Sequence, residues 1–391
     1  MNSAHTQAQR LSGLAAMMVL VVGMGFGRFA FTGIYPLMVT ENLLSVSAGS
    51  LAASANYAGY LLGALALAKL NVRHAPLAGI FALLATVAAL ALPGVVSATW
   101  ALVWIRGLAG VFSAVALVAG SVWLLHYMNR PHSAPLLYSG VGVGIFLSAE
   151  IIALSSAAGW RSMSIWLLLA LAGALLAAFA CTVLWRSRRD GPAAVNQPNS
   201  GAAPAASVFS NPWQLIGIYG LAGLGYIITA TYLPVLINQA LGGVGAIHVW
   251  AVFGLGAIPS CFLWHRINLR LGARRSLLLN LLIQGFGVML PAFGTSLPLS
   301  LASAVLVGGT FMGTVTIAMP AARALAAKVS FNMLAVMTAV YGIGQIAGPL
   351  AADALYQRSG TFSGALIFAA AALWLATALC LLTPHSFKRS H

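Results

Sequence analysis

Hydrophobic runs of about 20 residues or more recur along the whole of this 391-residue chain, separated by short polar segments. A run of this length crosses the hydrocarbon core of a bilayer as a single helix. Only 6% of the residues are charged, whereas a soluble domain contains about 25%, so this chain has no charged shell for a soluble core. The sequence therefore predicts an all-α polytopic membrane protein.

Prolines and polar clusters divide the runs into twelve predicted transmembrane helices. A tract rich in Pro, Ala, Asn and Gly follows the sixth helix and predicts a flexible linker. The expected domains are an N-terminal six-helix bundle (1–185), a linker (186–210) and a C-terminal six-helix bundle (211–391). The predicted spans are 14–38, 47–69, 76–96, 99–127, 135–158, 162–185, 212–236, 247–265, 276–295, 299–321, 331–355 and 362–383.

The distribution of basic residues predicts the orientation. Of the 19 Lys and Arg residues, Arg161 and Arg358 fall in loops on one side, and Arg28 and Arg106 fall within spans. The remaining 15 (19 less these four) fall in loops and tails on the other side. Because positively charged loops stay in the cytoplasm, we expect both termini and the linker to be cytoplasmic. This membrane location also explains the excess of basic residues better than nucleic-acid binding does.

The two halves contain a weak internal repeat. Residues 25–36 and 223–234 share a Gly-x-Gly pair followed nine residues later by Pro, at an offset of 198. The glycine-rich stretches 142–148 and 342–348 match at an offset of 200. A parallel repeat of six spans is typical of transporters whose two bundles rock about a central site. We interpret the glycine series as sites of close helix packing.

Twelve spans in two halves resemble the major facilitator superfamily over the whole chain. The fourth span, "RGLAGVFSAVALVAG" from Arg106, and the loop "LWHRINLRLGARRSLLL" (263–279) look like conserved motifs of that superfamily. The stretch "GMGFGRFAFTGIYPLM" (23–38), followed by "NYAGYLLGAL" (56–65), is similar to a bacterial branch, the YbfB/YjiJ-like transporters. The resemblance implies the major facilitator fold, transport and a location in the bacterial inner membrane, but no substrate.

Arg28 lies near the middle of the first span, within an otherwise apolar, small and aromatic sequence. Burial of a central arginine costs about 2.5–3.5 kcal/mol on insertion scales, so a compensating interaction is expected. We expect Arg28 to bind an anionic group of the substrate or to pair with an acid that titrates. The alternative is a structural role, in which Arg28 forms a buried bridge or backbone carbonyls near Gly23, Gly25 and Gly27 hold the guanidinium.

Glu150 is the only acid well inside a span, so it should be paired or protonated. We expect it to couple transport to protons by losing its proton when the site opens to water. The alternative is a static ion pair with Arg106 or Arg28. For Arg106, packing and substrate contact are both open.

The C-terminal half has no charge well inside a cavity-lining span, so its candidate site residues are polar or aromatic. Together with polar residues of the second span, they suggest an amphiphilic cavity for a substrate with an anionic head and an apolar body. With the two arginines, the predicted substrate-binding residues are Arg28, Asn56, Tyr60, Arg106, Tyr226, Thr314, Tyr341 and Gln345.

These features favour a proton-linked secondary transporter of a small organic anion that functions as a monomer among membrane lipids. The alternative is a multidrug-type proton antiporter that exports amphiphilic or cationic compounds. The sequence contains no Walker A motif and no nucleophile–base or metal-ligand arrangement at membrane depth, so we expect neither an enzyme nor a cofactor nor a metal site.

Overall fold

The computed structural model describes residues 2–191, 209, 211–241, 243–294 and 296–382, and these residues form helices and no strands. Short 3₁₀ turns connect several of the helices. The N-terminal helices are α1 (Asn2–Leu20), the π-helix η1 (Val21–Phe29), α2 (Ala30–Thr40), α3 (Val46–Ala66), α4 (Ala75–Ala91), α5 (Thr99–Val122), the π-helix η4 (Trp123–Tyr127), α6 (Ala134–Ala157) and α7 (Ser162–Asp190). The C-terminal helices are α8 (Pro212–Leu241), α9 (Gly243–Met289), α10 (Leu297–Leu325), α11 (Met333–Ser359) and α12 (Ser363–Leu381).

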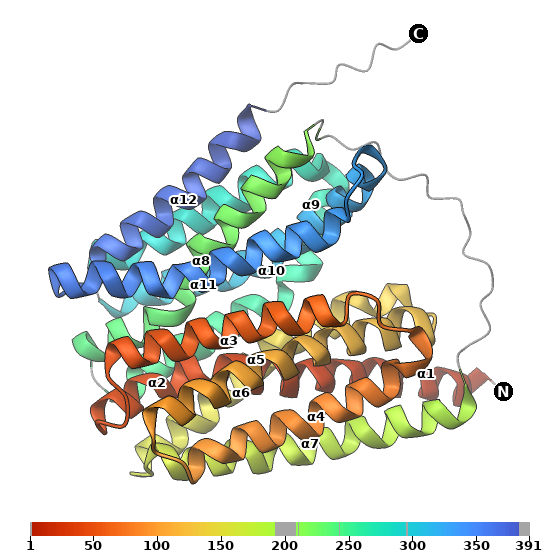
Figure 1. Cartoon of the computed structure of the whole chain (residues 1–391), viewed down its shortest axis with the longest axis horizontal. Helices are drawn as coiled ribbons and strands as arrows, with labels where there is room; N and C mark the ends of the chain where they lie inside the picture. Colours follow the sequence, from red (N-terminus) through yellow and green to blue (C-terminus); the bar gives the residue numbers. More distant parts are fainter. Residues whose placement is uncertain (1, 192–208, 210, 242, 295, 383–391) are drawn as a thin grey trace.

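Figure 1 shows the helices in two groups, α1–α7 and α8–α12, which we call the first and second groups. The N-terminus, the end of α7 and the start of α8 lie at the end of the molecule drawn on the right, here the linker end. The turns between α2 and α3 and between α11 and α12 lie at the opposite end, here the distal end. Most helices therefore run nearly the full length between the two ends.

Ten helical segments of the described residues are long and apolar enough to cross a membrane. The expected number was twelve, and two features account for the difference. The helix α3 is rich in Ala, Ser and Gly and also contains Asn56, Tyr57 and Tyr60, and it is not among the ten. The segment Gly245–Ala292 counts once, although Gly272 (φ 77°, ψ 163°) interrupts its helical backbone.

The helix α7 continues to Asp190, beyond the predicted end of the sixth span at 185. The predicted span ends at Trp185, and the added residues include Arg186, Arg188 and Arg189. Trp and Arg are typical of the membrane–water boundary, and Arg is a good helix former, so the helix has no reason to end with the apolar run. Residues 192–208 and 210 of the predicted linker lie outside the described residues, as does the basic C-terminal tail 383–391.

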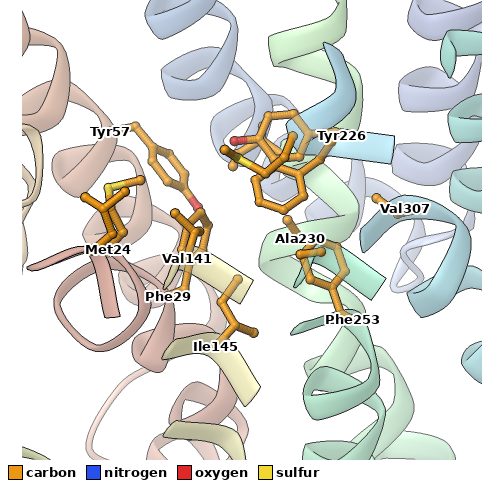
Figure 2. Close-up of a cluster of buried hydrophobic side chains, with 14 of the residues drawn as sticks. Met24, Phe29, Tyr57, Val141, Ile145, Tyr226, Ala230, Phe253 and Val307 are labelled. Carbon is orange, nitrogen blue, oxygen red and sulfur yellow. The ribbon is translucent and has the colours of Figure 1, made fainter. Parts of the chain in front are cut away.

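Small residues bring helices into backbone contact, as predicted from the glycine series. A Cβ on Gly142 of α6 would lie 2.6 Å from the Ile258 nitrogen of α9, and one on Gly254 would lie 2.6 Å from the Phe146 nitrogen. The two groups therefore meet along a closely packed crossing of α6 and α9. Beside it, buried apolar side chains form a continuous core across the two groups, which Figure 2 shows with Phe29 and Tyr57 facing Tyr226 and Phe253.

Candidate functional site

The first span changes its helical form around Arg28. The segment η1 (Val21–Phe29) is a π-helix, and all nine of its residues are buried. Its glycines permit close packing: a Cβ on Gly25 would lie only 2.3 Å from the Gly144 Cα of α6. Short π-helical insertions within α-helices are frequent at functional sites. This change of helical form was not predicted from the sequence.

Arg106 of α5 holds the C-terminal end of this π-helix. Its Nη1 donates to the Gly27 carbonyl (2.9 Å) and its Nη2 donates to the Arg28 carbonyl (2.8 Å). The Arg106 guanidinium carbon also lies 4.8 Å from the ring centroid of Phe31. Backbone carbonyls near the glycines thus bind a guanidinium, as one alternative predicted, but the guanidinium belongs to Arg106.

Asn56 of α3 extends this network, because its amide nitrogen donates to the Arg106 carbonyl at 2.8 Å. Asn56 and Arg106 are therefore brought together, and both terminal nitrogens of Arg106 are occupied by backbone carbonyls. These hydrogen bonds fix the position of the backbone from which the Arg28 side chain extends.

The Arg28 side chain is 4% exposed and lies against aromatic rings. Its guanidinium carbon is 4.1 Å from the ring centroid of Tyr60 and 5.0 Å from that of Tyr57, distances typical of cation–π contacts. Its Nε and Nη2 are buried and have no hydrogen-bond partner among the described residues. These two nitrogens share one edge of the guanidinium, and such an edge can bind a carboxylate through two parallel hydrogen bonds.

Three acids lie elsewhere with partners of their own, and one of them is Glu150, which pairs with His248. The Glu41 carboxylate accepts hydrogen bonds from the Ser162 backbone and hydroxyl, and the Asp353 carboxylate accepts one from Ser47 (2.9 Å). The fourth acid of the chain, Asp190, is at the end of α7. Among the described residues, the Arg28 guanidinium therefore has no paired carboxylate.

Aromatic residues of the second group form a stacked cluster that faces Arg28. The ring of Tyr226 stacks on Phe311 (5.6 Å between centroids) and on Tyr341 (5.9 Å), and Tyr341 stacks on Tyr219 (4.4 Å). The cluster reaches the first group beside Arg28, because the ring of Phe311 lies 6.2 Å from that of Phe29. Phe311 was not among the predicted site residues, because an apolar aromatic residue in a span is indistinguishable from packing.

Gln345 of α11 belongs to the same cluster. Its amide nitrogen donates to the Tyr226 hydroxyl, and its amide oxygen is buried with no partner among the described residues. Thr314 lies elsewhere: its hydroxyl donates to the Asn280 side chain (2.7 Å) within the second group. The structure thus brings Arg28, Tyr60, Tyr226, Tyr341 and Gln345 together, places Asn56 and Arg106 behind Arg28, and directs Thr314 toward α9.

Glu150 of α6 pairs with His248 of α9, at 3.0 Å between Oε1 and Nδ1. Both side chains are partly exposed, Glu150 to 30% and His248 to 49%. The alternative prediction of an ion pair with Arg28 or Arg106 is wrong, since Glu150 has this other partner. The contact joins the two groups and could not be predicted locally, because 98 residues separate its members.

Further hydrogen bonds join the two groups in the distal half of the molecule. The Tyr57 hydroxyl lies 3.0 Å from the Thr231 hydroxyl, and the Ser54 hydroxyl donates to the Ile346 carbonyl at 3.1 Å. The Tyr232 hydroxyl donates to the Ser50 hydroxyl. With Glu150–His248 and Ser47–Asp353, these bonds hold the groups together between the Arg28 cluster and the distal end.

Comparisons with known proteins agree with this architecture. The family model described as uncharacterised MFS-type transporter YbfB matches residues 20–381. Comparison with curated proteins gave no significant match. The crystal structure of a mutant of the nucleoside transporter NupG aligns with a TM-score of 0.69 and 12% identity, over 95% of this chain and 99% of that chain. At this identity the likeness concerns the fold alone.

The family model covers nearly the whole chain, and the predicted resemblance to the YbfB-like branch is thereby confirmed. The chain belongs to the YbfB-type family of the major facilitator superfamily (MFS) and is a multi-pass membrane protein that acts as a secondary transporter.

Proposed function

We propose that this transporter carries a small organic anion across the bacterial inner membrane by proton-linked alternating access. Family membership supports a small-molecule substrate and a secondary mechanism. Particular residues support the anionic charge of the substrate, the coupling to protons and the orientation in the membrane.

The proposed topology has twelve spans with both termini in the cytoplasm. The helix α3 packs along α5 and α11 and adds one span to the ten apolar segments, and the interruption at Gly272 divides another into two. The bundles 1–185 and 211–391 are then joined by the linker 186–210. The concentration of Lys and Arg at the linker end supports a cytoplasmic location of that end, so the distal end faces the opposite side of the membrane.

The observation that carries the anion assignment is the unpaired edge of Arg28. Two buried N–H groups of a cation without partners are costly, and a bound carboxylate satisfies both at once. The rings of Tyr57 and Tyr60 lie against the guanidinium, and the rings of Tyr226 and Tyr341 provide an apolar surface for the body of the substrate. Gln345 adds an amide oxygen without a partner, which can accept a hydrogen bond from a hydroxyl or an amine of the substrate.

A cationic substrate fits this cluster poorly. A cation needs a carboxylate or an array of carbonyls, and three of the four acids are engaged away from Arg28 while Asp190 ends α7. Two buried guanidinium groups would also repel the substrate. The structure therefore favours the anion carrier over the multidrug-type antiporter.

Glu150 is the proposed proton site, with His248 as its partner. In this closed arrangement of the distal half, the carboxylate is stabilised by the imidazole across the interface. The contact is lost when the groups separate at the distal end. Because protonation of Glu150 weakens this contact, it favours opening. Proton binding and opening are then linked through a free-energy difference between two conformations.

The test is uptake of radiolabelled organic acids into proteoliposomes that contain the purified protein, with and without an inward proton gradient. Arg28→Ala is expected to lower anion uptake at least 30-fold, roughly the lower bound for removing one partner of a buried charge pair. Arg28→Lys keeps the charge but loses the paired edge, so it recovers only part of the activity. Glu150→Gln is expected to abolish the response to the proton gradient and to retain anion exchange.

Arg161→Gln is the matched control, because it removes one positive charge from an exposed residue at the distal end. Uptake by this variant should equal that of the wild type. Anion uptake that persists in Arg28→Ala would refute the anion site. Selective uptake of lipophilic cations instead would establish the multidrug alternative.

A further inference from the structure

A second site lies away from the Arg28 cluster, on the outer surface of the first group. An open hollow of about 350 Å³ is formed by α4 and the last turns of α7, near the linker end. Its lining residues are Ile80, Cys181, Thr182, Trp185, Arg186 and Arg189.

Four of these residues follow helical spacing on α7. Thr182, Trp185, Arg186 and Arg189 stand at i, i+3, i+4 and i+7, so they share one face of the helix. All four are exposed. Two guanidinium groups and an indole therefore line the same hollow. Arg188 lies next to this face, with its guanidinium carbon 5.2 Å from the ring centroid of Trp185.

The same face of the helix pair becomes apolar toward the distal end. On α7, Leu171 and Leu175 precede Thr182 at helical spacing, and on α4, Leu84 follows the lining residue Ile80 by one turn. These three side chains are 58–68% exposed. The surface thus combines a cationic hollow with an exposed apolar strip that leads away from it.

We infer that this hollow binds the headgroup of an anionic phospholipid, with its phosphate between Arg186 and Arg189. Guanidinium groups bind phosphate oxygens through paired hydrogen bonds. Trp185 occupies the depth at which indoles mark the headgroup region, and the apolar strip is the surface for the acyl chains. Basic hollows between transmembrane helices are typical sites for anionic lipid headgroups.

The experiment measures the thermal stability of the full-length protein in detergent as lipid is added. Phosphatidylglycerol is expected to raise the apparent melting temperature by about 3 °C or more, because a ligand that binds the folded state stabilises it. Phosphatidylcholine and inorganic phosphate should each give less than half of this shift. Equal shifts with phosphatidylcholine would overturn the headgroup assignment, and an equal shift with inorganic phosphate alone would assign the hollow to a small anion.

The double substitution Arg186→Gln/Arg189→Gln is expected to remove at least half of the phosphatidylglycerol shift. The matched control is Arg270→Gln/Arg275→Gln, which removes two exposed charges from α9. The control should keep the full shift. Equal losses in both variants would show general charge attraction and overturn the assignment. Native mass spectrometry of the same samples should show lipid retained by the control and lost from the Arg186/Arg189 variant.

Discussion

The first span (Arg10–Thr40) and α8 share the Gly-x-Gly…Pro spacing, at 25–36 and 223–234, but their backbones differ. The first span changes to a π-helix over Val21–Phe29, whereas α8 stays α-helical through its 30 residues, Pro234 included. The spacing alone therefore does not cause the π-helix.

A second residue explains the difference. Arg106 donates hydrogen bonds to the Gly27 and Arg28 carbonyls. A π-helix changes the hydrogen-bond pattern of the backbone, and these side-chain bonds stabilise the carbonyls at its end. At the offset of 198 residues, Arg106 corresponds to Ala304, which has no donor to offer. The glycines allow close packing in both halves, and the two arginines together make the first half the charged one.

The substitution Arg106→Met should have the largest effect, because it removes the residue that distinguishes the π-helix of the first span from α8. It leaves the carbonyls of Gly27 and Arg28 buried without their donor, which costs about 2–4 kcal/mol. We expect a clear fall in melting temperature and a loss of most transport, because Arg28 is no longer held in place. Thermal denaturation and uptake in proteoliposomes measure the two effects.

The control for this substitution is Ser303→Ala, next to the corresponding position in the second group. The Ser303 hydroxyl is buried and has no hydrogen-bond partner among the described residues, so its removal should cost little. A melting temperature of Arg106→Met equal to that of Ser303→Ala would show that Arg106 does not brace the π-helix.

Alanine at the matching glycines should give a smaller and unequal effect. A Cβ on Gly25 meets the backbone of Gly144 at 2.3 Å, so two helices must separate. A Cβ on Gly223 meets the Tyr341 carbonyl at 2.7 Å and the Tyr341 ring at 2.9 Å, so a smaller shift relieves the clash. We expect Gly25→Ala to cost about 2–3 kcal/mol and Gly223→Ala about 1–2 kcal/mol.

Melting temperatures of the two alanine variants, compared under one condition, decide this prediction. A larger loss in Gly223→Ala would mean that the second group is the more tightly constrained of the two.

The membrane helices and their glycine contacts could be predicted from the sequence because both depend on local patterns. Long apolar runs specify spans, and Gly142 and Gly254 show the close packing expected of small residues in such runs. The helix α3 shows the limit of hydropathy, because its sequence is less apolar and its place in the fold depends on packing against α5 and α11.

The candidate site was less predictable, because its key contacts join residues far apart in the chain. Arg106 reaches carbonyls 78 and 79 residues away, and Glu150 meets His248 across the interface. Residue type suggested that Arg106 and Thr314 contact substrate. In the structure, Arg106 instead binds the Gly27 carbonyl and Thr314 binds Asn280, because these partners lie within reach in the fold.

Tyr226 corresponds to Arg28 at the same offset, and Tyr226→Phe should give the smallest effect. The ring stacks on Phe311 and Tyr341 are retained, while the bond from Gln345 is lost, worth about 1 kcal/mol or a roughly five-fold weaker substrate affinity. Gln345→Met removes the other partner, and a double variant completes the cycle. If the two groups act as one pair, the double variant costs less than the sum of the single ones. Strict additivity would separate them, and a loss as large as that of Arg28→Ala would make the tyrosine hydroxyl, rather than the guanidinium, the main contact for the substrate.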